Sequence, residues 1–185
     1  VGCGAGVAGV TDEFHFVYNY LEGDGSITAR IESIDDVHAW TKAGVMVRAN
    51  LDPDGAFAAV LATPGSGVSY HTRTAAGSPA TTDEHVATPE QSALRTPVWI
   101  RLEREGDHFS AFTSSDGVAW NPMAWGPQQV FMAPRVCIGL AVTSHDRERT
   151  AEARISHVTT TGEMLCVGHL RQSQDVRLQP PPPPQ

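Results

Sequence analysis

Residues 12–32 read DEFHFVYNYLEGDGSITARIE, and this stretch decides the fold class of the 185-residue chain. Aromatic side chains occupy every second position from Phe14 to Tyr20, and apolar and polar residues alternate from Ile27 to Glu32. A two-residue period is typical of β-strands, because successive side chains point to opposite faces of a sheet. The segment LEGDGS between the two runs carries an Asp-Gly pair, which is frequent in tight turns between antiparallel strands. We therefore predict two strands joined as a hairpin.

The same alternation recurs through most of the chain, and no long window shows the 3.6-residue period of a helix. Turn-rich segments such as TPGSG and REGDH separate the alternating runs. Roughly nine or ten short strands of this kind indicate an all-β fold, a two-sheet antiparallel β-sandwich. Beyond the first pair, strands are predicted at residues 42–49, 56–63, 67–74, 97–104, 108–115, 136–144 and 150–159.

Two segments lack this alternation. Residues 75–96 are small, polar and punctuated by proline, which predicts a long surface loop that is either functional or disordered. The pattern also fades after Gly162, and the chain ends in five prolines, 180–184, which are typical of an extended spacer. We therefore predict a sandwich domain over residues 1–162 and a tail or linker over residues 163–185. With a first residue that is Val rather than Met, we expect one module of a longer chain.

The charge balance narrows the range of partners. The chain has 21 acidic and 13 basic residues, for a net charge of −8, whereas contacts with nucleic acid or anionic membranes need clustered positive charge. No stretch approaches the roughly 20 apolar residues of a membrane span. We expect neither nucleic acid nor a membrane as a partner.

The three cysteines, Cys3, Cys137 and Cys166, are too widely spaced for a CxxC metal or redox motif. Cys137 lies in the apolar run VCIGLAV and is expected to be a small buried side chain. Cys3 and Cys166 could pair if the two terminal segments meet, and that alternative stays open.

Signatures of catalysis and of metal binding are weak. The segment GAGVAG (4–9) matches the dinucleotide motif by letter, but it lacks a preceding strand and a following helix. The carboxylate pairs Glu103 with Glu105 and Asp35 with Asp36 sit at expected turns, where acids are ordinarily solvated. We therefore expect no enzymatic activity.

No cofactor is expected either, and calcium is the one metal candidate. Asp52 and Asp54 in LDPDGA offer it two carboxylates, although Asp-Pro-Asp-Gly is also a complete turn signal. The segment SSDGVAW (114–120) is similar to the Asp-box of sialidase-type propellers but occurs once, so we predict a hairpin with Trp120 over the edge of the core.

Alternation also predicts a polar face. If Val45 and Val47 face the core, then Lys42 and Arg48 face outward, and the same reasoning applies to the strands at 67–74 and 97–104. The candidate ligand-binding residues on one sheet face are then Lys42, Arg48, His71, Arg73, Trp99 and Arg101. Guanidinium groups make planar contacts with several donors, and Trp offers a flat apolar platform, which suits a sugar or an anionic glycan.

The alternative is a solvated face with Trp99 packed under the loop 75–96. Trp40 and Trp125 lie in turn regions and are candidates for rim aromatics or for buried anchors.

Five segments follow one another in the chain: DEFHFVYNYLEGDGSITARI, KAGVMVRANLD, ATPGSGVSYHTR, TPVWIRLEREGDHFSAFTSSDGVAW and IGLAVTSH. In this order they resemble the concanavalin A-like jelly-roll modules of large secreted bacterial proteins, in the same broad group as the regulation-of-enolase-like domains of unknown function. The resemblance spans about residues 2–162. It implies a two-sheet jelly roll, an extracellular or cell-surface location beside other modules, and a glycan-binding role. It also implies that Arg48, Arg73 and Arg101 occupy recurrent strand arginines.

Two departures from the family pattern matter. GAGVAG stands where such modules have additional strands and an Asp-x-Trp element, so an edge of the sheet is expected to need cover from residues 163–178 or from a partner chain. The Glu-x-Asp-x-x-Glu motif of laminarinase-type relatives is missing, which argues against catalysis.

The leading hypothesis is a non-catalytic carbohydrate-binding module. The alternatives are a structural domain that self-assembles into a homo-oligomer through an exposed edge, and a glycoside hydrolase.

Overall fold

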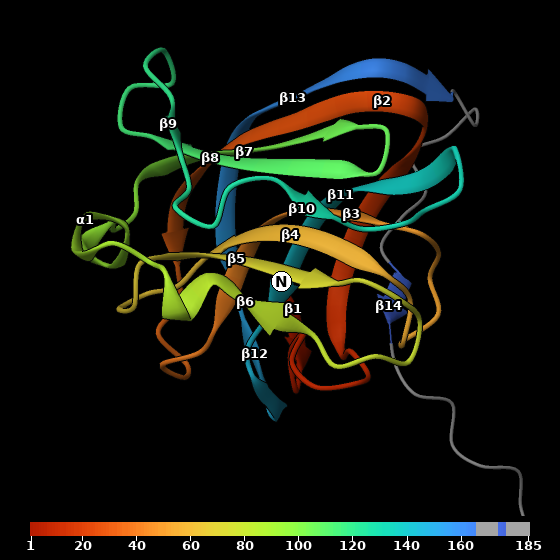
Figure 1. Cartoon of the computed structure of the whole chain (residues 1–185). Coiled ribbons are helices and arrows are strands. Elements are labelled where there is room, and N and C mark those ends of the chain that lie inside the picture. The colour runs from red at the N-terminus through yellow and green to blue at the C-terminus, as the bar shows by residue number, and fades with distance from the viewer. Residues whose placement is uncertain (166–173, 177–185) are drawn as a thin grey trace, which may run out of the picture.

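The computed structural model describes residues 1–165 and 174–176, and most of the regular structure in them is strand, which confirms the all-β prediction (Figure 1). The helical elements are η1 (Asp83–His85) and α1 (Pro89–Ala93). The strands are β1 (Gly2–Gly4), β2 (Phe14–Ile34), β3 (Lys42–Arg48), β4 (Phe57–Ala62), β5 (Val68–Arg73), β6 (Thr81–Thr82), β7 (Val98–Glu105), β8 (His108–Ser114), β9 (Asn121–Pro122), β10 (Gln128–Gln129), β11 (Arg135–Thr143), β12 (Asp146–Ala151), β13 (Ala153–Leu165) and β14 (Gln174–Val176).

The strands predicted between residues 42 and 144 are confirmed. The segment predicted as one strand at 150–159 is instead divided between the end of β12 and the start of β13. In the part of the chain that the structure describes, no helix is long and apolar enough to cross a bilayer.

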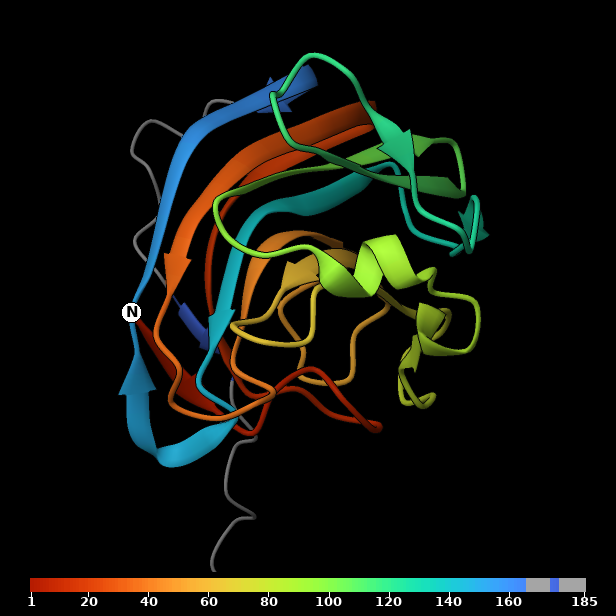
Figure 2. The ribbon, with the colours of Figure 1, turned by 90° about the vertical axis from the view of Figure 1, so that its left-hand side faces the viewer.

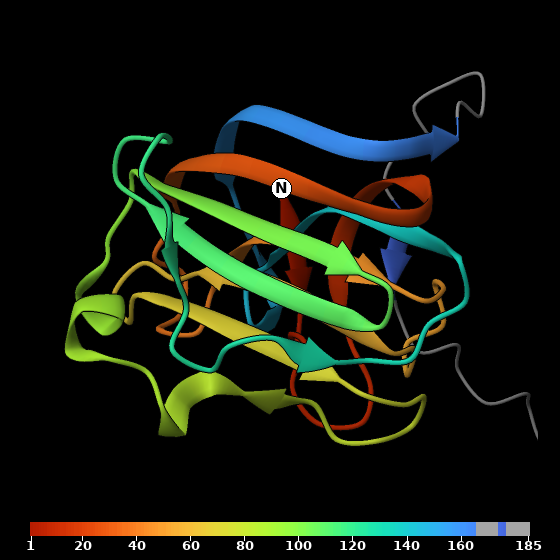
Figure 3. The ribbon, with the colours of Figure 1, turned by 45° about the horizontal axis from the view of Figure 1, so that its top comes forward.

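Strand β2 belongs to both layers of the sandwich. Its first part pairs with β11 over residues 15–22, and its second part pairs with β7 over residues 25–31. We call β14, the first part of β2, β11, β3, β4, β5 and β6 the front layer, and β13, the second part of β2, β7, β8, β9 and β10 the back layer. Figure 2 shows the curved course of β2, and Figure 3 shows β13, β2, β7 and β8 side by side in the back layer.

The predicted hairpin within residues 14–31 is wrong, because the chain bends at LEGDGS and does not reverse. Gly23 adopts a positive φ of 70° and donates its N–H to the Pro134 carbonyl. The Asp24 carboxylate accepts the Gly106 N–H from the β7–β8 turn. The Asp-Gly segment thus supplies the left-handed backbone of a bend, while both halves of β2 find their partners far along the chain.

An apolar core fills the space between the two layers. Val45, Val60 and Tyr70 of the front layer pack with Ile100 and Phe109 of the back layer. The Tyr70 hydroxyl crosses this core and donates to the Phe109 carbonyl at 2.7 Å. The alternate side chains that were predicted to face the core from the strands at 42–49, 67–74 and 97–104 therefore do so.

A second apolar cluster lies on the outer face of the front layer and includes Phe16, Met46 and Phe57. Residues 5–13, which we call the N-terminal cover, lie on this face, and Val7 packs into the cluster. The cover is held from both sides, because the Asp12 N–H donates to the Pro53 carbonyl and the Gly9 carbonyl accepts from Ala80. Side chains that point away from the sandwich core are therefore buried here all the same.

The C-terminal part of the sheet extends past the predicted boundary at residue 162. Strand β13 runs to Leu165 along β2, and β14 pairs with Phe14–Phe16 of the same strand. The prediction that residues 163–178 cover an edge of the sheet is confirmed for the described part of that range. The proline run and Cys166, and with it the Cys3–Cys166 pairing, lie outside the described residues.

The segment 75–96 is exposed over much of its length but is not simply a surface loop. It forms β6, η1 and α1, and it buries Asp83 and Gln91. Cys137 is buried in the second apolar cluster, as predicted.

Candidate functional site

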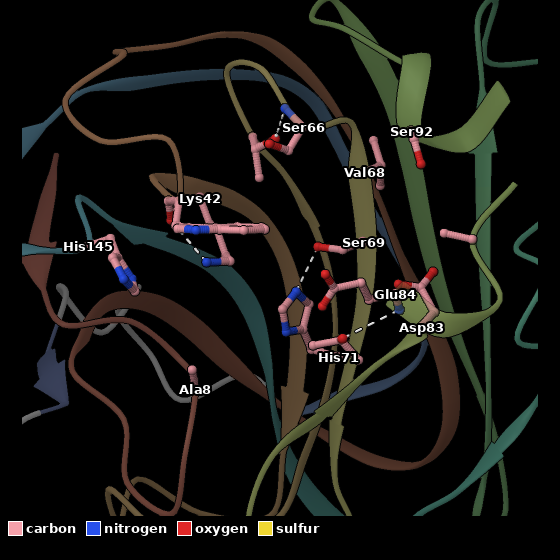
Figure 4. Close-up of a pocket in the computed structure, with 14 residues that line it drawn as sticks. Ala8, Lys42, Ser66, Val68, Ser69, His71, Asp83, Glu84, Ser92 and His145 are labelled. Atoms are coloured by element: carbon pink, nitrogen blue, oxygen red, sulfur yellow. Dashed lines mark hydrogen bonds between the residues drawn. The ribbon is translucent and has the colours of Figure 1, made fainter. Parts of the chain in front are cut away.

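A pocket of about 510 Å³ lies on the outer face of the front layer, beside the N-terminal cover (Figure 4). Lys42 reaches it from the start of β3, and Ser69 and His71 reach it from β5. The wall of the pocket also includes Trp40, Glu84 and His145. Alternation places Lys42, Ser69 and His71 on this face, because residues of that parity point away from the sandwich core.

Lys42 is a buried cation without a carboxylate partner among residues 1–165. The residue is 5% exposed, and its ammonium donates to the Trp40 carbonyl at 3.0 Å. The ammonium also lies 5.2 Å from the centre of the Trp40 ring. Burial lowers the pKa of Lys42 to about 8, because the charged form loses hydration that the protein only partly replaces.

His71 is buried and directs an unsatisfied nitrogen to the same region. Its Nε2 is 2.7 Å from the Ser69 hydroxyl, whereas Nδ1 has no hydrogen-bond partner within the described chain. Burial, and to a lesser extent the charge of Lys42, lowers the pKa of His71 to about 3. The imidazole is therefore neutral at physiological pH, and one of its nitrogens is buried without a hydrogen-bond partner among the described residues.

His145 forms the opposite wall, near the N-terminal cover. Its pKa is lowered by burial first and then by the charges of Lys42 and His38. The rings of His145 and His38 lie 4.7 Å apart, and His38 Nδ1 accepts the Trp40 N–H. A Cβ on Gly6 would come within 3.0 Å of His145 Nδ1, so this glycine of the GAGVAG segment makes room for the imidazole.

Trp40 lies at the mouth of the pocket with 44% of its surface exposed, which agrees with its prediction as a rim aromatic. Trp125 is partly buried and packs against the core, with its ring 5.4 Å from that of Tyr70.

Asp83 anchors the long segment 75–96 to β5. Its carboxylate accepts the Tyr70 N–H at 3.0 Å and a hydrogen bond from the Gln91 amide. Burial raises the pKa of Asp83, and these bonds partly offset that effect. Sequence reasoning missed Asp83 and His145, since neither lies in an alternating strand and nothing local marks them as pocket residues.

Arg48 and Arg73 do not face solvent, which corrects the sequence prediction. Both are 0% exposed, and both bind the carboxylate of Asp12, at 2.8 and 2.7 Å. Both side chains point away from the sandwich core, as predicted. They are buried because the N-terminal cover lies over them, and Asp12 supplies the opposing charge. Burial lowers the pKa of Arg48, and the neighbouring Asp12 raises it.

Trp99 and Arg101 lie on the outer face of the back layer, on the other side of the sandwich core. The Arg101 guanidinium lies 3.9 Å from the centre of the Trp120 ring and donates to Thr28. Trp99 packs near His157 rather than under the loop 75–96, with 5.1 Å between their rings. The predicted convergence of all six residues on one face is therefore wrong, because alternation distinguishes inward from outward but not one layer from the other.

The hairpin predicted for SSDGVAW is confirmed by the pairing of β8 with β9, although Trp120 stacks on Arg101 rather than covering the core. At the predicted calcium segment, Asn50 donates to the Asp52 carboxylate and Arg48 donates to the Asp52 carbonyl. Within residues 1–165, no three His, Cys, Asp or Glu side chains gather as a metal-ligand cluster.

Comparisons with known proteins place the fold. No protein-family model matches the chain, and no curated protein sequence matches it. A functionally unknown protein from Saccharomyces cerevisiae is similar in structure, with a TM-score of 0.61 and 17% identity over 81% of this chain and 75% of that one. The GH43 protein BlXynB from Bacillus licheniformis is similar with a TM-score of 0.53 and 10% identity, over 76% of this chain.

This chain spans 28% of the Bacillus protein. At such low identities these similarities bear on the fold alone. The chain is an antiparallel β-sandwich whose two layers share β2.

Proposed function

We propose that this domain is a non-catalytic carbohydrate-binding module whose sugar binds in the pocket beside Trp40. The observation that carries the proposal is the half-exposed Trp40 indole at the mouth of a pocket whose inner wall holds polar atoms without partners. A sugar ring presents an apolar C–H face that packs on an aromatic ring, and hydroxyls that need hydrogen-bond partners.

The inner wall offers such partners. The Ser69 hydroxyl lines the pocket and can donate to or accept from a sugar hydroxyl. The Lys42 ammonium has three N–H donors, and one of them is used by the Trp40 carbonyl. The cavity volume of about 510 Å³ lies in the range of about 300–1,000 Å³ that is usual for small-molecule sites.

The proposal includes an extracellular or cell-surface location beside other modules of a longer chain, which is what the sequence resemblance implies. The arrangement of the pocket's carboxylates supports a non-catalytic role. Asp83 is engaged by Tyr70 and Gln91, so it is not available as the second acid that glycoside hydrolysis requires beside Glu84.

The test is a binding screen on a glycan array, followed by calorimetry with the best ligand, on the wild type and on Trp40→Ala. A sugar ring that covers roughly 60 Å² of the indole contributes about 1.5 kcal/mol, so Trp40→Ala should weaken binding about tenfold. The matched control is Trp120→Ala on the back layer, which should leave the affinity unchanged.

Two results would overturn the proposal. One is a loss of binding in Trp120→Ala with none in Trp40→Ala, which would move the site to the back layer. The other is release of reducing ends from a polysaccharide panel, abolished by Glu84→Gln, which would make the domain a hydrolase.

A further inference from the structure

The buried charge of Lys42 is not balanced by the protein. Arg48 and Arg73, which are also buried, share the Asp12 carboxylate at distances below 3 Å. Lys42 is the one lysine of the chain, and its ammonium donates to a backbone carbonyl while no ion pair forms to it in the described part of the chain. A buried cation is ordinarily paired, because its desolvation is otherwise uncompensated.

The two carboxylates of the pocket wall, Asp83 and Glu84, do not fill this role, because neither forms an ion pair with Lys42 in the described part of the chain. The two carboxylate oxygens of Asp83 are engaged with the Tyr70 N–H and the Gln91 amide. Burial is the cause of the lowered pKa of Lys42, and no carboxylate acts against it. Two N–H donors of the ammonium are therefore left for a ligand.

Figure 4 shows His71 and Lys42 in the same pocket. His71 Nε2 is bonded to the Ser69 hydroxyl and Nδ1 is buried without a partner in the described chain, so the neutral imidazole adds no charge beside the ammonium. Lys42 is therefore the one cation among the residues named in the wall, and the Glu84 carboxylate also lines the pocket.

We propose that the pocket selects a sugar that carries a carboxylate, such as a hexuronic acid, over the neutral sugar of the same ring. The carboxylate accepts from the two remaining N–H donors of the Lys42 ammonium, while the sugar ring packs on Trp40. A single negative charge matches the single cation, so a carboxylate suits this wall better than a doubly charged phosphate. This inference rests on the proposed function, since it names the substrate class of the same pocket.

The experiment compares matched methyl glycosides by calorimetry: glucuronic acid with glucose, galacturonic acid with galactose, and mannuronic acid with mannose, with acetate as a carboxylate that lacks a sugar. The proteins are the wild type, Lys42→Met and Arg101→Met. Arg101→Met is the matched control, because it removes one positive charge from the back layer and gives the same net charge as Lys42→Met.

In the wild type and in Arg101→Met, at least one acid should bind about tenfold more tightly than its neutral counterpart. Lys42→Met should bring that ratio close to one, because the acid sugar loses an ion pair whereas the neutral sugar loses only one hydrogen bond. A far-ultraviolet dichroism spectrum and a thermal melt of each variant establish that it is folded.

Other outcomes separate this inference from the function on which it rests. If acid and neutral sugars bind equally, with both affinities reduced in Trp40→Ala, the selectivity is refuted and the carbohydrate site stands. If the acid sugar still binds more tightly than the neutral sugar in Lys42→Met, Lys42 is not the group that selects the carboxylate. If acetate binds as tightly as the acid sugar, the pocket is a simple carboxylate site, and both proposals fail.

Discussion

Replacing Lys42 with methionine should make the folded domain more stable at neutral pH, because it removes a buried charge that the protein does not balance. Methionine has a similar length and fills the same space among apolar neighbours. The gain should depend on pH. The unfavourable charged form is fully present below the folded pKa of about 8, and its cost disappears as the pH rises through the unfolded value of 10.5.

The size of the effect follows from these two pKa values. Each tenfold difference in proton affinity corresponds to about 1.4 kcal/mol, so the range from 10.5 to about 8 amounts to about 3 kcal/mol at pH 7. Methionine also loses the hydrogen bond to the Trp40 carbonyl, which is worth about 1 kcal/mol. Lys42→Met should therefore raise the free energy of unfolding by about 2 kcal/mol at pH 7, and by less than about 0.5 kcal/mol at pH 10.

Urea unfolding followed by tryptophan fluorescence at pH 7, 8, 9 and 10 measures this difference directly. The comparison variant is Arg101→Met, whose half-buried cation lies on the back layer and should change stability by less than about 1 kcal/mol at every pH. The reasoning is refuted if Lys42→Met is less stable than the wild type at pH 7, or if the difference between the two chains is the same at pH 7 and pH 10.

Two further predictions concern the buried ions of the front layer. Asp12→Asn should lower the free energy of unfolding by about 3–5 kcal/mol, since it leaves two buried arginines without a counter-ion, whereas Asp52→Asn at an exposed turn should change it by less than about 0.5 kcal/mol. Equal urea midpoints for the two variants would contradict the first prediction. The affinity for an acid sugar should fall by up to about tenfold in total above about pH 8, as Lys42 loses its proton, because His71 and His145 are already neutral there. Calorimetry from pH 7 to 9.5 checks this, with the neutral sugar as the reference that should not change.

Alternation of side chains predicted most strands and the direction in which they point, because both are local properties of an extended backbone. For this reason, Lys42 and His71 were correctly predicted to point away from the sandwich core. Their burial was not predictable, since it depends on the irregular N-terminal cover, whose glycine-rich sequence has no periodicity to read. The wrong prediction that Arg48 and Arg73 face solvent has the same cause. Nothing in the sequence near Asp12 indicates that its carboxylate binds side chains of two distant strands.

The error at residues 21–26 has a different origin. Asp-Gly segments permit a left-handed backbone, and a hairpin and a bend both use it. Which one forms depends on whether the two flanking strands pair with each other or with more distant partners. Here the partners come from β7, β11 and β13, which local sequence does not specify. Trp99 and Arg101 were placed on the wrong face by the same lack of long-range information.

The position of β2 in both layers also sets the order in which the chain can assemble. Its partner β11 begins at residue 135 and β13 ends at residue 165, so neither layer is complete until most of the chain has left the ribosome. Until then the aromatic face of β2, from Phe14 to Tyr18, has no sheet to join, and pairing over such long sequence separations is slow. A nascent chain of this protein should therefore depend on chaperone protection of β2 for longer than a domain built from local hairpins.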